Sequence, residues 1–200
     1  MEVKILERNS DEIKIKVTNI VPSIAAMIRR SIIAEIPTMA IEWVDFYKND
    51  SVLPDEIVAH RLGLIPLSFD KKIHTLPNKC ECGGKGCPRC QVKLYLYKKG
   101  PGYVYSGDLK TSDESVKPIY DKIPITYLNE DEEIELEAIA QLGLGKEHAK
   151  WQAGNCGYSY NDSEFIFNIE TTSYYKPEEL FEEAINVIIE KLEELKQKIS

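Results

Sequence analysis

The sequence predicts an α+β fold, because it carries two different hydrophobic periods. Short segments in which apolar and polar residues alternate are typical of strands with one buried face, and they recur through most of the chain. Two other segments, at 23–35 and 177–199, repeat their apolar residues every three or four positions, as amphipathic helices do. A chain of 200 residues is long enough for one core, or for one core with an inserted domain.

The first predicted elements are a hairpin and a helix. Residues 2–18 alternate on both sides of a polar turn at 8–11, which predicts two antiparallel strands. Pro22 is typical of a helix start, and Pro37 ends the helix that follows. The apolar face of this helix consists of three isoleucines spaced four residues apart, Ile24, Ile28 and Ile32.

Strands dominate the middle of the chain. Residues 39–47 include isoleucine, tryptophan and valine and predict a strand, whereas Pro54-Asp55-Glu56 predicts the start of a short helix. Further strands are predicted at 92–97, 103–105, 123–127, 134–142 and 165–170.

The C-terminal helix has the strongest pattern. Pro177 suits a first helical position, and Glu178 and Glu179 complement the positive end of the helix dipole. The apolar positions are separated by steps of four, three, four, three and four: Phe181, Ile185, Ile188, Leu192, Leu195 and Ile199. A second apolar stripe consists of Leu180, Ala184, Val187 and Ile189. A helix that is apolar on two sides must bury both sides against other surfaces. We therefore expect one side to pack on the sheet of its own chain and the other side to bind a partner.

Composition narrows the function classes. The net charge of −8 and the pI of about 5.1 argue against a stand-alone nucleic-acid-binding protein, which would carry a basic face. No apolar run approaches the length of a membrane span, and the N-terminal residues lack a signal-like apolar region. We therefore expect a cytoplasmic protein with reduced thiols.

Four of the five cysteines lie within residues 80–90, at Cys80, Cys82, Cys87 and Cys90. Thiolates this close together usually bind a metal ion, and zinc prefers four such ligands in a tetrahedron. Four protein ligands leave no position for water or substrate, so the ion would be structural. An iron–sulfur cluster, two disulfides and a redox dithiol remain alternatives.

No catalytic site is evident in the sequence. Glu147, His148 and Lys150 could support acid–base chemistry, but no nucleophile with an orienting base lies near them in the sequence. The glycines at 143 and 145 lack the spacing and the Ser or Thr of a phosphate-binding loop. We therefore expect no catalytic residues in this chain.

Three segments in order, at 29–41, 53–67 and 142–151, resemble motifs of the alpha-like subunits of DNA-directed RNA polymerases. The third, Leu142-Gly-x-Gly-Lys-Glu-His-Ala-Lys-Trp151, is typical of the archaeal and eukaryotic branch. With the strand at 165–170 and the long helix, the similarity covers essentially the whole chain and is greatest to the archaeal D-type subunits.

This resemblance implies a non-catalytic assembly subunit. It implies a discontinuous dimerisation domain at 1–45 and 164–200, with an inserted, mainly β domain at 46–163 that carries the cysteine loop. The implied partners are the smaller subunit L in a heterodimer, the small subunits N and P, and the second-largest catalytic subunit. Arg29 and Arg30 match a motif that contacts the catalytic subunit. The implied interface with L comprises Ile24, Ile28, Ile32, Phe181, Ile185, Ile188, Leu192, Leu195 and Ile199.

Two departures from the family concern metal binding. Many D-type subunits carry an iron–sulfur insertion after the region of Trp151, whereas this chain continues to Phe165 within a few residues. Its cysteines instead follow Leu67, where eukaryotic counterparts have a zinc loop, which favours zinc over an iron–sulfur cluster. Cys156 stands alone and is expected to be a small buried residue. The alternatives are a metal-dependent enzyme that uses the cysteines with His148, and a zinc-stabilised adaptor unrelated to transcription.

Overall fold

The computed structural model describes residues 1–161 and 164–199 and divides the chain into two compact units. Unit 1 combines residues 1–38 with the chain from residue 144 onward, and unit 2 consists of residues 39–143. Antiparallel pairs of strands dominate both units and helices are few, so the predicted α+β class is confirmed. No helix of the described residues is long and apolar enough to cross a membrane.

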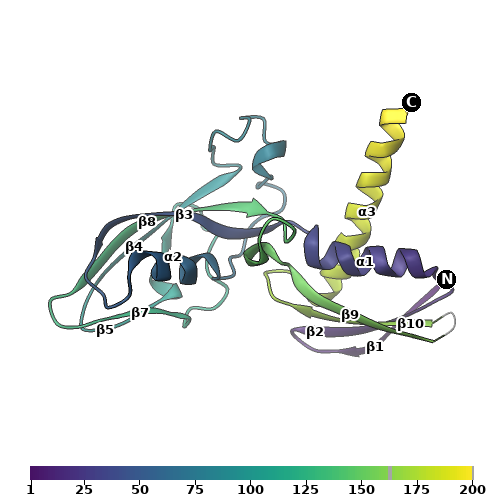
Figure 1. Ribbon diagram of the computed structural model, residues 1–200, viewed down its shortest axis with the longest axis horizontal. Helices are drawn as coiled ribbons and strands as arrows, with labels where there is room; N and C mark the ends of the chain where they lie inside the picture. Colours follow the sequence, from purple (N-terminus) through teal and green to yellow (C-terminus); the bar gives the residue numbers. More distant parts are fainter. Residues whose placement is uncertain (162–163, 200) are drawn as a thin grey trace. The chain divides into compact units, whose positions relative to one another are not determined.

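Unit 1 is built on a four-stranded sheet with the order β1-β2-β10-β9 (Figure 1). The strands are β1 (Glu2–Arg8), β2 (Glu12–Thr18), β9 (Gly154–Asn161) and β10 (Glu164–Thr171). The predicted hairpin forms between β1 and β2, and β10 pairs antiparallel with both β2 and β9. The sequence prediction had not included β9.

Two helices pack on one face of this sheet: α1 (Pro22–Ala34) and α3 (Pro177–Ile199). The core between helices and sheet contains Ala25, Ile28, Ile32, Phe165, Phe167, Ile169, Leu180 and Ala184. Gly154 allows α3 to pack closely on β9, because a Cβ atom at this position would lie 2.6 Å from both Leu180 Cδ1 and the carbonyl oxygen of Glu170. Tyr175, just before α3, donates a hydrogen bond of 2.9 Å to the carbonyl oxygen of Pro37.

Unit 2 contains one four-stranded sheet, one two-stranded sheet and a short helix. The larger sheet has the order β3-β8-β4-β6, with β3 (Thr38–Asn49), β4 (Gln91–Lys99), β6 (Lys110–Thr111) and β8 (Glu133–Gly143). The smaller sheet pairs β5 (Gly102–Tyr105) with β7 (Pro124–Leu128). Helix α2 (Asp55–Gly63) begins after Pro54, as predicted, and Arg61 donates a hydrogen bond of 2.8 Å to the carbonyl oxygen of Ile125 in β7.

The units divide at positions that differ from the predicted boundaries after residues 45 and 163. Unit 2 already begins at Met39, because most of β3 lies in the same sheet as β8. Unit 1 resumes at Leu144, because β9 pairs with β10 along its length and Lys146 donates its backbone N–H to the carbonyl of Ala34. Residues 162, 163 and 200, which belong to the predicted domain ranges, lie outside the described residues.

Candidate functional site

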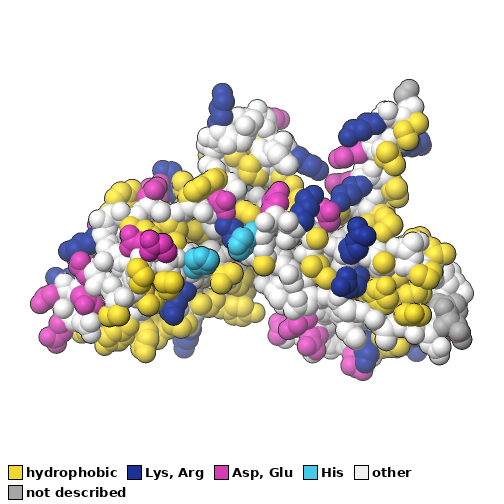
Figure 2. All heavy atoms as spheres, viewed as in Figure 1, with side chains coloured by type: hydrophobic (Ala, Val, Ile, Leu, Met, Phe, Trp, Pro, Cys, Tyr) yellow, Lys and Arg dark blue, Asp and Glu magenta, His cyan; other side chains and the backbone are white. Residues whose placement is uncertain are grey.

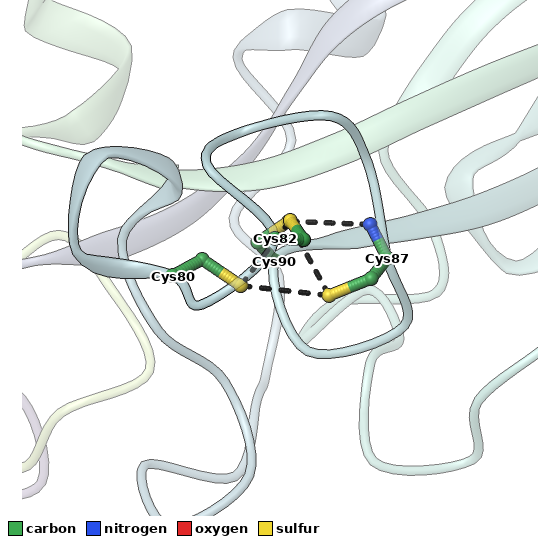
Figure 3. A group of neighbouring side chains, drawn as sticks. All are labelled: Cys80, Cys82, Cys87 and Cys90. Atoms are coloured by element: carbon green, nitrogen blue, oxygen red, sulfur yellow. Dashed lines mark hydrogen bonds between the residues drawn. The ribbon is translucent and has the colours of Figure 1, made fainter.

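The four clustered cysteines converge in the loop that precedes β4 (Figure 3). Their sulfur atoms all lie within 4.8 Å of one another. The individual distances are 3.4 Å from Cys82 to Cys80, 3.5 Å from Cys80 to Cys87, 3.6 Å from Cys82 to Cys90 and 3.8 Å from Cys87 to Cys90. Four sulfurs at about 2.3 Å from one ion would be separated by about 3.8 Å in a regular tetrahedron. The cluster therefore fits a single tetrahedral ion.

Glycines make this tight loop possible. Gly83, Gly84 and Gly86 have φ angles of 66°, 78° and 88°, which residues with a Cβ atom rarely adopt. A Cβ atom on Gly86 would also collide with the side chain of Gln91. The backbone N–H of Cys87 donates to the sulfur of Cys90 at 3.3 Å, so part of the charge of a Cys90 thiolate would be neutralised by the backbone.

The thiols differ in their affinity for protons. The hydrogen bond with Cys80 is the largest of the effects that lower the pKa of Cys82 to about 6. Burial raises the pKa of Cys90 to about 12. A thiolate is thus favoured at Cys82 near neutral pH, and an incoming cation would have to displace the proton of Cys90.

A buried histidine, His74, lies at the start of the cysteine loop and contacts two aspartates. The His74 side chain is fully buried, and its Nδ1 lies 3.1 Å from the carbonyl oxygen of Asp70. Its Nε2 lies 3.4 Å from the carboxylate of Asp113. Hydrogen bonds from Ser115 are the main reason that the pKa of Asp113 is lowered, so this carboxylate stays charged beside the imidazole. The next residue, Thr75, donates its N–H to the carbonyl of Arg89 and closes the base of the loop.

The helix positions predicted to bind a partner fall into two groups. Ile28 and Ile32 are only 4% and 0% exposed in a helix that packs against both α3 and β9 of its own unit. Their predicted contact with a partner stays a prediction, because an apolar helix face indicates burial but not which surface buries it. Ile24 is 45% exposed, and so is its neighbour on the helix surface, Met27, at 39%.

On α3 the buried residues end at Ala184. Phe181 is half-buried against Phe167, with ring centroids 5.6 Å apart, and Ile188 is half-buried. The remaining predicted positions are more open: Ile185 is 36%, Leu192 56%, Leu195 55% and Ile199 78% exposed. Figure 2 shows hydrophobic side chains along this projecting part of the helix.

A groove of about 530 Å³ lies between α1 and α3. Apolar side chains on its two walls include Met27, Ile188, Leu192 and Leu195. Arg29 and Arg30 also line it; Arg30 is exposed, whereas Arg29 is half-buried. We call this feature the α1–α3 groove.

Glu35, at the end of α1, fixes one end of the α1–α3 groove. Its carboxylate forms ion pairs of 2.9 Å with Lys191 of α3 and 3.1 Å with Lys146. Partial burial opposes ionisation, but the hydrogen bonds from the two lysines outweigh it and lower the pKa of Glu35. Sequence reasoning had included Glu35 only as part of a motif, because pairs so distant in sequence leave no local signal.

Glu147, His148 and Lys150, which were considered for acid–base chemistry, each interact with a residue close to them in the sequence. Glu147 accepts the N–H of Leu144, and His148 Nδ1 accepts the N–H of Lys150. The Lys150 amine lies 4.5 Å from the ring centroid of Trp151. Cys156 is buried, as predicted, and burial raises its pKa to about 12, so it is a poor nucleophile.

Comparisons with known proteins identify relatives of this chain among RNA polymerase subunits. Residues 40–165 match the family described as RNA polymerase Rpb3/RpoA insert domain. The DNA-directed RNA polymerase subunit Rpo3 of Methanosphaera stadtmanae is 48% identical over 80% of this chain and 61% of its own length. The subunits of the same name from Methanothermobacter thermautotrophicus and Pyrococcus furiosus are 44% and 45% identical over 80% of this chain and 62% and 59% of their own lengths. The chain thus spans about three fifths of these relatives. Because the family match covers more than half of the sequence, the chain belongs to the Rpb3/RpoA family of RNA polymerase subunits.

Proposed function

We propose that the chain is a non-catalytic subunit of DNA-directed RNA polymerase that serves as a platform for assembly. The observation that carries this proposal is the uncovered apolar surface of α3 beyond Ala184, in a chain of the Rpb3/RpoA family. An exposed apolar stripe on a long helix is typical of a protein interface. The relatives are named as polymerase subunits, which supports the same role here.

The partner we propose for this surface is an L-type subunit, bound as a heterodimer by unit 1. Candidate contacts are Ile24, Phe181, Ile185, Ile188, Leu192, Leu195 and Ile199. Complete burial of a leucine side chain contributes roughly 1.5–3 kcal/mol, so a half-exposed leucine gains about 1 kcal/mol when covered. Association costs roughly 4–15 kcal/mol in lost motional freedom, so a stable pair also needs the apolar surface that the partner buries against these residues.

The other proposed partners are the small subunits N and P and the second-largest catalytic subunit. Arg30 supports a contact with the catalytic subunit, because it is exposed beside the α1–α3 groove. Its guanidinium carries a permanent charge and suits an acidic side chain at a protein interface.

We also propose a structural zinc ion bound by Cys80, Cys82, Cys87 and Cys90. The sulfur separations of 3.4–3.8 Å support one ion, whereas an iron–sulfur cluster has several metal atoms and would need more space. The same sulfur separations are too long for a disulfide bond, whose S–S distance is about 2.05 Å. Zinc would neutralise the thiolates and hold the loop. Four thiolate ligands would leave no open position, which disfavours a metal-dependent enzyme.

Co-expression with an L-type subunit tests the proposed role. We expect a stable complex to purify through a tag on either chain, and the pair to bind the second-largest catalytic subunit. A chain that stays monomeric in the presence of the L-type subunit would reject the proposal. If the chain is instead a zinc-stabilised adaptor unrelated to transcription, the tagged chain should capture no polymerase subunit.

A further inference from the structure

Unit 2 contains a groove beside the cysteine loop that no part of the proposed function uses. Its volume is about 560 Å³, and it lies where the loop meets the first residues of β4. Apolar side chains from the loop and from the larger sheet contribute to its lining: Pro88, Val92 and Ile139. The segment that follows β6 supplies Asp113 and Glu114. We call this feature the β4 groove.

The edge of β4 is open where it borders the β4 groove. Strand β6 pairs with β4 only at Leu94 and Tyr95, and the N–H of Ser112 then donates a hydrogen bond of 3.1 Å to the carbonyl oxygen of Lys93. The N–H and C=O of one strand residue point to the same side, as do those of the residue two positions away. The N–H of Lys93 and the carbonyl of Gln91 therefore point to this edge, where no strand of the described residues pairs with them. Such an edge is a template for an extended polypeptide.

The cysteine loop gives this part of an acidic chain a positive charge. Residues 70–93 contain five lysines, one arginine and two acidic residues, a net charge of +4, whereas the whole chain has −8. Four thiolates around a divalent ion add a charge of about −2 and leave the segment positive. Lys85, Arg89 and Lys93 are all exposed, and each lines the β4 groove or is next to a lining residue in the sequence. Figure 2 shows Lys and Arg side chains on the loop, which stands off the larger sheet in Figure 1.

Two of these cations already bind carboxylates of the same chain. Arg89 lies 3.4 Å from Glu81, and Lys93 lies 2.7 Å from Glu137. The Arg89 and Glu81 side chains are 64% and 89% exposed, and an exposed pair of this kind contributes little to stability. A carboxylate of another molecule can therefore take the place of Glu81. Lys93 can bind a further carboxylate while it stays paired with Glu137, because its amine has three N–H donors.

These features favour a polypeptide over a nucleic acid as the occupant. A polypeptide backbone offers N–H and C=O groups at the spacing that completes the edge of β4. Hydrogen bonds from Ser115 lower the pKa of Asp113, so a charged carboxylate lines the β4 groove and would repel a chain of phosphates. The positive side chains attract carboxylates, and Val92 and Ile139 favour apolar side chains.

We propose that the β4 groove binds an extended acidic segment of a partner protein, which adds a strand to the edge of β4 and places carboxylates beside Lys85, Arg89 and Lys93. One residue of a parallel strand can accept from the N–H of Lys93 and donate to the carbonyl of Gln91, because these two groups flank Val92. The side chain of that residue projects with Val92 and should be apolar, whereas its neighbours project with Lys93 and should be acidic. The proposal is independent of the proposed function, because the surface assigned to the L-type subunit lies on unit 1.

Binding of synthetic peptides to the full chain tests this inference. The probe is a fluorescent peptide of about eight residues that alternates valine and glutamate, titrated by fluorescence anisotropy. We expect a dissociation constant below about 1 mM, and no binding of a peptide with lysine in place of glutamate. N-methylation of the valines removes the N–H groups that would pair with β4 and should abolish binding. N-methylation of the glutamates, whose N–H groups would point away from β4, should not.

Two exposed lysines of unit 2 provide matched variants. Lys85→Glu reverses a charge beside the β4 groove and should raise the dissociation constant of the valine–glutamate peptide about fivefold. Lys122→Glu changes the net charge equally but lies just before β7, in the other sheet, and should leave the affinity unchanged. Circular dichroism verifies that both variants are folded. The peptide should also slow the hydrogen exchange of residues 91–93 in the parent chain.

Four results would overturn the inference. The first two are a dissociation constant for the valine–glutamate peptide that is not below about 1 mM, and an affinity that methylation of the valines leaves unchanged. Equal weakening by Lys85→Glu and Lys122→Glu would show attraction to the overall charge rather than to the β4 groove. Tighter binding of a duplex DNA of about ten base pairs would assign the loop to nucleic acid instead. The complex with the L-type subunit is measured separately, so the proposed function would stand in each case.

Discussion

Gly154→Ala should loosen the packing of α3 on its sheet. The new Cβ atom would lie 2.6 Å from Leu180 Cδ1 and from the carbonyl oxygen of Glu170, whereas ordinary contacts begin near 3.4 Å. The helix and the strand must therefore separate by roughly 0.8 Å, and overpacking of this kind costs about 1–3 kcal/mol. Because the oxygen belongs to the backbone of β10, it cannot move aside as a flexible side chain would.

Gly157→Ala is the matched control, since it makes the same change on the same strand. A Cβ atom at this position meets nothing within 4 Å. We expect this variant to be neutral, or more stable by roughly 0.4–1 kcal/mol, because alanine has fewer unfolded conformations than glycine.

Urea unfolding followed by the fluorescence of Trp151 measures this difference. Trp151 is buried in unit 1, and a Trp43→Phe background removes the only other tryptophan. We expect the midpoint of unfolding to fall for Gly154→Ala and not for Gly157→Ala. Equal midpoints for both variants would refute the close packing of α3 on β9 and β10.

Further predictions concern the metal loop and Glu35. A chelator, or Cys90→Ser, should speed hydrogen exchange across residues 71–92 and leave binding of the L-type subunit unchanged; loss of binding by a folded variant would contradict the separate roles of loop and helices. Glu35→Gln should lower the stability of unit 1 by about 1 kcal/mol in urea unfolding, and added salt should shrink the difference; an unchanged midpoint at low salt would argue against the bridge. Because the pKa of Glu35 is lowered on folding, its contribution is present above the unfolded pKa near 4.5 and is lost as pH falls through the folded value, so parent and variant should converge in acid.

Local signals predicted some elements well. The bounds of α3 match the prediction, because Pro177 marks a helix start and the apolar steps of four and three continue to Ile199. The cysteine cluster was also predictable, since spacing alone restricts how far apart the sulfurs can lie. The metal that it binds stays a prediction.

Other features depend on tertiary contacts that the sequence does not encode locally. Strand β9 contains Gly154, Asn155 and Gly157, which read as a loop, and it becomes a strand because β10 pairs with it. The isoleucines of α1 show the same limit: their period predicts a buried face, but only the structure shows that Ile28 and Ile32 are already buried within their own unit, whereas Ile24 is exposed. The link from Glu35 to Lys191 joins residues on two helices that only folding brings together.

The affinity of the chain for an L-type subunit tests the central claim most directly. Leu192→Glu places a carboxylate on the exposed apolar stripe of α3, and burial of that charge without a partner would be strongly unfavourable. Gln197→Glu adds the same charge at an exposed polar position of the helix and serves as the control. We expect sedimentation velocity to show a one-to-one complex for the parent chain and the control, and two separate species for Leu192→Glu. A complex that forms equally well with Leu192→Glu would contradict the assignment of this helix surface to the partner.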